Sequence, residues 1–305
     1  MISLPAVELA TFFFGLLLGS FLNVCIARLP AQKSIIKPGS HCPHCLTPIR
    51  WYDNIPVLSF LFLRGRCRSC STKISAQYPL VELAVGLWFV FATHHTAVAL
   101  ANPELLGSTA VLEGVALAAT GFLLIGVLVT DWQTQIIPDG FTFSGMALGF
   151  FLVCVETVFL PPGDDDIHMK HQLRLSSPGS MVERGDVFLT GTEHLVFGRL
   201  GAILAAAGIL LAVRMIYKAL RKREGLGLGD VKLLAMISAL LGLYPALLAL
   251  FLGVILCSLY AVAMLLRGKA SGATRLPLGS FLAIGGLLAA SVGPIILNWY
   301  TGLLR

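Results

Sequence analysis

Four cysteines stand in two closely spaced pairs, Cys42 with Cys45 and Cys67 with Cys70. Each pair reads Cys-x-x-Cys, and 21 residues separate the two pairs. Paired thiolates at this spacing are typical of a tetrahedral Zn²⁺ site, because each short turn offers two sulfurs to one ion and the loop between the turns closes the site. Four protein ligands leave no open coordination position. We therefore predict that these residues hold a structural zinc ion.

The surrounding loop leaves alternatives open. His41 precedes the first pair and His44 lies inside it, so either could serve as a substitute ligand, and a redox dithiol is a second use for the cysteines. A loop of about 50 residues is too small to build a good core alone, so the metal would serve mainly to fold it. The other three cysteines lie in apolar segments, where we expect them to pack: Cys25, Cys154 and Cys257.

Two aspartates lie at the ends of apolar segments. Asp131 follows the run 121–130, and Asp230 ends the pattern Gly-x-Gly-Asp within the glycine-rich stretch 225–232. Two carboxylates that meet share a proton, so that one activates water as a general base and the other protonates a carbonyl or a leaving amine. We therefore predict that Asp131 and Asp230 form an aspartic-protease pair.

Other acidic residues compete for these roles. Asp139 is the rival first carboxylate, although it is well placed to stabilise the start of a helix. Lys232 is close enough in sequence to pair with Asp230, which would make that residue structural. Asp53 is expected in a turn, and Glu82 either caps a helix or faces a site. A proton relay in a transporter would also use two such aspartates.

The elements that must position these residues are membrane helices. Of the 305 residues 56% are hydrophobic and 12% are charged, and the mean hydropathy is +0.84. These values exclude an ordinary soluble enzyme, a disordered protein and a nucleic-acid binder. A spanning helix needs about 20 mostly apolar residues. Eight segments qualify: 5–27, 79–100, 110–130, 140–160, 195–217, 230–244, 246–266 and 279–299.

The basic residues predict how these segments are oriented. The stretches 28–78, 214–232 and 267–278 hold 17 of the 22 lysines and arginines and fall on one side of an eight-span chain. The positive-inside rule makes that side cytoplasmic. Asp131 and Asp230 then lie at the same cytoplasmic face.

The sequence thus predicts an all-α polytopic membrane protein with about eight transmembrane helices and a small cytoplasmic zinc-binding module. We expect a first transmembrane helix over 1–27, the four-cysteine module over 28–78, and a transmembrane core over 79–305. Within that core the stretch 161–194, with six acidic and three basic residues, is expected to be an extracytoplasmic polar loop.

Together these segments resemble the type IV prepilin peptidases, the bacterial leader peptidases and N-methyltransferases of type IV pilus and type II secretion systems. The resemblance runs in order along most of the chain. It rests on 19–24, 28–30, the two cysteine pairs, 52–59, 63–67, 78–82, Asp131 with 137–139, 227–233, and 281–283 with Gly285 and Gly286. Two departures are the long stretch 161–194 and the segment 276–280, which differs from the family's usual loop there.

The resemblance implies an intramembrane aspartyl protease of the GxGD type, with Asp131 and Asp230 as catalytic residues. Such an enzyme cuts the leader of prepilins and pseudopilins at the cytoplasmic membrane face and then methylates the new N-terminal residue with S-adenosylmethionine. It resides in the bacterial inner membrane with its active site facing the cytoplasm, and the bilayer rather than nucleic acid is its other partner.

Alternative functions remain. The chain shows no glycine-rich βα fingerprint for S-adenosylmethionine, so the methyltransferase rests on the resemblance alone. A peptidase without methyltransferase activity is therefore one alternative. The others are a proton-coupled membrane transporter that uses the aspartate pair, and a non-catalytic zinc-containing assembly protein.

Overall fold

The computed structural model describes residues 3–101, 107–159, 192–222, 226–268 and 276–303. In these ranges the chain is helical, with two isolated β-bridges and no strand, which confirms the all-α class. Two compact units make up the chain, Met1–Thr130 and Asp131–Arg305. Nearly all of the predicted polar loop 161–194 lies outside the described residues.

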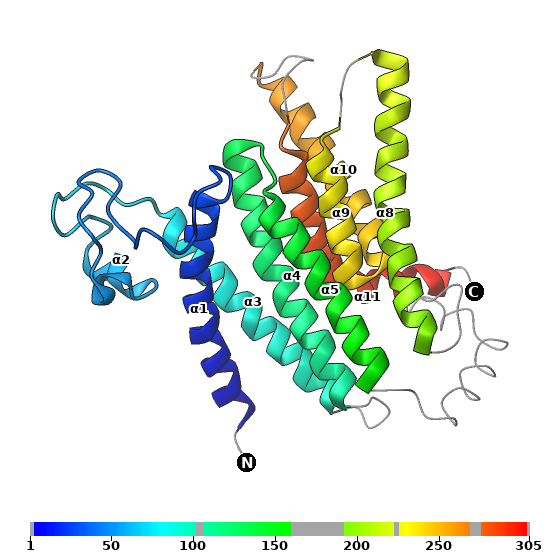
Figure 1. Ribbon diagram of the computed structural model, residues 1–305, viewed down its shortest axis with the longest axis horizontal. Helices are drawn as coiled ribbons and strands as arrows, with labels where there is room; N and C mark the ends of the chain where they lie inside the picture. The colour runs from blue at the N-terminus through cyan, green and yellow to red at the C-terminus, as the bar shows by residue number, and fades with distance from the viewer. Residues whose placement is uncertain (1–2, 102–106, 160–191, 223–225, 269–275, 304–305) are drawn as a thin grey trace. The chain divides into compact units, whose positions relative to one another are not determined.

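Helices form over all eight apolar segments (Figure 1). Their bounds are α1 Leu4–Arg28, α3 Gln77–Leu100, α4 Gly107–Thr134, α5 Asp139–Phe159, α8 Thr192–Arg221, α9 Leu228–Leu241, α10 Leu243–Leu266 and α11 Leu278–Leu303. Among the described residues six helices are long and apolar enough to cross a bilayer, namely all of these except α9 and α11. The chain is therefore a multi-pass membrane protein, while the count of eight spans stays a prediction.

In the first unit, α1 and α3 pack along each other through small residues. A methyl carbon at Gly15 would lie 2.8 Å from the Cα of Gly86, and one at Gly19 would lie 2.6 Å from the Cα of Glu82. Glycines four residues apart let two membrane helices approach this closely. The loop that joins α1 to α3 carries the four cysteines, the 3₁₀ helix η1 (Trp51–Asn54) and the short helix α2 (Leu58–Phe62).

In the second unit, α9 is the central helix. It packs against α5, α8, α10 and α11 (Figure 1), and its residues from Asp230 on are almost all buried. Gly242, with φ +94°, stands alone between the end of α9 and the start of α10. A positive φ of this kind suits glycine, which has no Cβ to clash. The fold therefore carries Asp230 into the centre of the unit.

The contact between α10 and α11 also depends on glycines. A methyl carbon at Gly253 would lie 2.9 Å from the Cα of Leu282, and one at Gly285 would overlap the carbonyl oxygen of Ala249. Because backbone atoms cannot yield as the end of a flexible side chain can, the two helices must separate to accept any larger residue.

We expect the substitution Gly285→Ala to lower the free energy of unfolding by about 1–3 kcal/mol, the usual cost of overpacking. Thermal unfolding in detergent measures the effect. The matched control is Gly201→Ala in α8, where a methyl group meets no atom within 4 Å. This control should be neutral or slightly stabilising, since alanine favours a helix more than glycine does. Equal melting temperatures for the two variants would contradict the close packing of α10 and α11 at Gly285.

Candidate functional site

Asp131 lies near the end of α4 and is 5% exposed. Its Oδ2 atom accepts hydrogen bonds from the backbone N–H of Ser280 at 2.6 Å and from the Ser280 hydroxyl at 3.0 Å. Ser280 belongs to the first turn of α11, whose free N–H groups and positive dipole end attract a carboxylate. Gly279 leaves room for this approach, because a methyl carbon there would lie 3.0 Å from Asp131 Cγ.

Asp230 lies in the first turn of α9 and is 9% exposed. The backbone N–H of Gly227 donates to its Oδ2 atom at 3.1 Å, so the side chain caps its own helix. The segment before it is fixed by Arg214, whose Nη1 atom donates to the carbonyl of Leu226 at 2.9 Å. The glycine-rich sequence therefore forms a tight helix start that holds the Asp230 carboxylate in place.

Asp131 and Asp230 belong to the same unit and lie within electrostatic reach of each other and of Cys257 in α10. Across the described residues each carboxylate is held through its Oδ2 atom, and its Oδ1 atom makes no hydrogen bond. Two neighbouring carboxyl groups in an apolar setting share one proton more easily than they hold two charges. The arrangement can thus supply a general base and a general acid.

Asp139 does not join this pair. It is the first residue of α5, its side chain is 60% exposed, and its Oδ1 atom lies 2.7 Å from Lys232 Nζ. Lys232 therefore pairs with Asp139 rather than with Asp230. An exposed ion pair of this type adds little stability.

Three aromatic side chains of the second unit form a cluster, and sequence reasoning assigned them no role. The rings of Trp132, Tyr260 and Phe281 are 5.2–6.3 Å apart between centroids. Trp132 follows Asp131 in the chain, and Phe281 follows Ser280. For Trp132 and Phe281, these neighbouring places in the sequence are the signal that could have identified them.

The four cysteines come together in the first unit. All four Sγ atoms lie within 4.8 Å of one another, with 3.8 Å between Cys42 and Cys70 and 4.0 Å between Cys45 and Cys67. A tetrahedral zinc ion with Zn–S bonds of about 2.3 Å places its sulfurs about 3.8 Å apart. The four thiols therefore have the spacing that Zn²⁺ requires.

Two threonines complete this centre, and sequence reasoning missed them. The backbone N–H of Cys42 donates to the carbonyl of Thr47 at 3.0 Å, and that of Cys67 donates to the carbonyl of Thr72 at 2.9 Å. Each threonine hydroxyl also lies 3.3 Å from the Sγ atom of the second cysteine of its own pair. A sequence signal for the two threonines does exist, because both cysteine pairs continue as Cys-x-x-Cys-x-Thr.

These contacts favour thiolates. The hydrogen bond with the Thr47 side chain lowers the pKa of Cys45 to about 6. Backbone N–H groups of Cys70 and Ser69 lower the pKa of Cys67. The thiolate is the form of cysteine that binds metal. One thiol in each half, Cys45 and Cys67, is therefore prepared for an ion, whereas burial and the neighbouring thiols raise the pKa of Cys42.

The two remaining acidic candidates have partners of their own in the first unit. Asp53 lies in η1 and accepts two hydrogen bonds from Arg68, at 2.6 Å from Nη2 and 2.8 Å from Nε, and these lower its pKa. The pairing ties η1, the expected turn, to the second cysteine pair. Glu82 is buried in α3, and its Oε2 atom accepts the backbone N–H of Val57 at 2.7 Å.

Comparisons with known proteins agree with these features. Residues 13–96 match the bacterial peptidase A24 N-terminal domain, and residues 187–262 match the type IV leader peptidase family. The first match contains all four paired cysteines. The second contains Asp230, whereas Asp131 lies between the two matches.

Curated relatives match over much longer stretches. A prepilin leader peptidase/N-methyltransferase from Klebsiella pneumoniae is 35% identical over 76% of this chain and 83% of its own length. Proteins of the same name from Aeromonas hydrophila and Bacillus subtilis are 31% and 32% identical and cover 95% of this chain, with 92% and 96% of their own lengths. No solved structure matches the chain. With a helical membrane core, a paired carboxylate site and relatives of this kind, the chain belongs to the type IV leader peptidase family.

Proposed function

We propose that this chain cleaves the leader of prepilins and N-methylates the product, the two activities that the names of its relatives state. The observation that carries the peptidase assignment is the pair of buried carboxylates, Asp131 and Asp230, held at the starts of two helices. Pseudopilins, as substrates of the same chemical type, are included in the proposal.

Peptide hydrolysis needs one group to take a proton and another to give one. The two Ser280 donors stabilise a negative Asp131, so we assign Asp131 as the base that takes a proton from water. The resulting hydroxide attacks the scissile carbonyl carbon. Asp230 then gives its proton to the amide nitrogen as the C–N bond breaks, which yields a carboxyl group on the leader and a free amine on the product.

Substitution of either aspartate, Asp131→Asn or Asp230→Asn, should lower the rate of prepilin cleavage by at least about 100-fold, because each removes a proton-transfer group. Cleavage of a co-purified prepilin in detergent, followed by gel mobility and mass spectrometry, is the measurement. Asp139→Asn is the matched control, since that exposed side chain pairs with Lys232. It should cleave within about threefold of the parent protein, as the loss of a surface ion pair costs little. A variant at Asp131 or Asp230 that retains cleavage would refute the role given to that residue.

We assign methyl transfer to the part of the chain that holds the four cysteines, residues 28–78, with S-adenosylmethionine as the methyl donor. The cysteines would hold Zn²⁺, which supplies cross-links that fold this small segment rather than a catalytic open position. The described part of the first unit contains helices and turns without a βα phosphate loop. We therefore assign no residue to the methyl donor.

The double substitution Cys42→Ser with Cys45→Ser should reduce bound zinc from one ion per chain to near zero, because it removes half of the ligands. N-methylation of the product should fall with it, while cleavage continues. Elemental analysis and product mass spectrometry on one sample give all three values. Cys154→Ser, a change outside the cluster, is the control and should keep its zinc. Full zinc content in the double variant would contradict the metal assignment.

We also propose that the chain resides in the bacterial inner membrane with the cleavage site on the cytoplasmic face. The distribution of the basic residues supports this orientation, because 17 of 22 lie in three stretches on one predicted side.

A further inference from the structure

The segment 51–62 presents apolar side chains outward. Trp51 is 80% exposed and Phe62 is 83% exposed, and Leu58 and Leu61 are exposed beside them. We call these four side chains the apolar edge. A surface that faces water rarely shows large apolar groups so close together, and such a patch marks a surface that contacts a membrane or another molecule.

A hydrogen bond places this segment beside the membrane helices rather than beyond their ends. The backbone N–H of Val57 donates to Glu82 Oε2, and the backbone of Glu82 packs on Gly19. Gly19 stands nine residues before Arg28, the last residue of α1. At 1.5 Å per residue this is about 13 Å back along the helix. Residues next to Val57 therefore lie alongside α1, within the length that crosses the bilayer.

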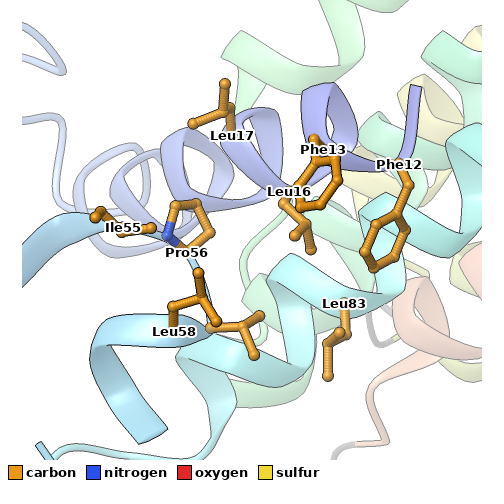
Figure 2. Close-up of a pocket in the computed structure, with 9 residues that line it drawn as sticks. Phe12, Phe13, Leu16, Leu17, Ile55, Pro56, Leu58 and Leu83 are labelled. Carbon is orange, nitrogen blue, oxygen red and sulfur yellow. The ribbon is translucent and has the colours of Figure 1, made fainter. Parts of the chain in front are cut away.

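A cavity of about 320 Å³ separates the turn from the two helices (Figure 2). Its walls come from residues 55–58, from Phe13 and Leu17 of α1, and from Leu83 of α3. Leu17 and Phe13 are also exposed. The lining is built from carbon-rich side chains, so the cavity suits a hydrocarbon chain that enters from the side of the helix pair.

The charge around the apolar edge is predominantly positive. The stretch 28–78 contains eight lysines and arginines, with Asp53 as its one acidic residue. Arg64 and Arg66, just after α2, are exposed. Basic side chains next to exposed apolar ones are the composition of elements that lie in a membrane interface, where anionic lipid headgroups attract the charges.

From these features we propose that segment 51–62 is an interfacial membrane anchor. Its apolar edge enters the acyl-chain region beside α1, and an acyl chain occupies the cavity behind residues 55–58. Arg64 and Arg66 bind the headgroups of anionic phospholipids. The anchor holds the four-cysteine segment against the bilayer surface, and it depends on α1 spanning the membrane but not on the proposed catalysis.

Photocrosslinking of the full-length chain in lipid nanodiscs tests the anchor. A diazirine amino acid is placed singly at Leu61 or Phe62, at Leu17 as a lipid-facing reference, and at Ser69 as an exposed reference within the cysteine segment. Intact-mass spectrometry then counts phospholipid adducts. We expect adducts at Leu61 and Phe62 at a level near that at Leu17 and about tenfold above that at Ser69, as interfacial burial requires. Yields equal to that at Ser69 overturn the proposal.

A second arm tests the headgroup contact and the identity of the occupant. The double substitution Arg64→Gln with Arg66→Gln should reduce adducts at Leu61 in discs that contain phosphatidylglycerol, to the level found in discs of phosphatidylcholine alone. An unchanged yield overturns the role of the arginines. Added prepilin that displaces the lipid adducts and becomes crosslinked itself would assign the apolar edge to substrate and refute a lipid anchor. Cleavage measured in the same discs reports the proposed peptidase separately.

Discussion

Two carboxylates held together inside an apolar helical bundle repel each other, and removing their charges from water is costly. In the second unit, hydrogen-bond donors at the starts of two helices stabilise these carboxylates. Ser280, in the first turn of α11, donates twice to Asp131, and Gly227, before α9, donates to Asp230. Free N–H groups occur in a membrane helix mainly at its first turn. The site lies where two helices begin, and the glycine at position 279 leaves room for Asp131 at the start of α11.

The first unit is subject to a different constraint. The loop between α1 and α3, which carries the four cysteines, is too small to form a hydrophobic core. Two turns of the same design, each a Cys-x-x-Cys-x-Thr knuckle, bring four sulfurs to metal-binding spacing. The Asp53–Arg68 ion pair ties η1 to one knuckle, and the Glu82–Val57 hydrogen bond ties the following turn to α3. Local contacts of this kind replace hydrophobic burial, which small segments cannot supply.

Sequence patterns predicted the helices and the cysteine centre well, because apolar length and Cys-x-x-Cys spacing are local signals. Through topology alone they predicted that Asp131 and Asp230 form a pair, and this pairing stays a prediction. They did not predict Ser280 as the donor to Asp131, since 149 residues separate the two. Lys232 was considered as a partner of Asp230, but residues two apart in a helix point in different directions, and Lys232 reaches Asp139 instead. The roles given to the aspartates and to zinc stay predictions.

The shortness of α9 has a consequence for how the protein is made. Fourteen residues rise about 21 Å, less than the roughly 30 Å of hydrocarbon in a bilayer. A helix of this length depends on burial among its neighbours, which here are α5, α8, α10 and α11. Because α10 and α11 follow α9 in the chain, the burial of Asp230 and the contact of Ser280 with Asp131 can form only after all three helices have been synthesised.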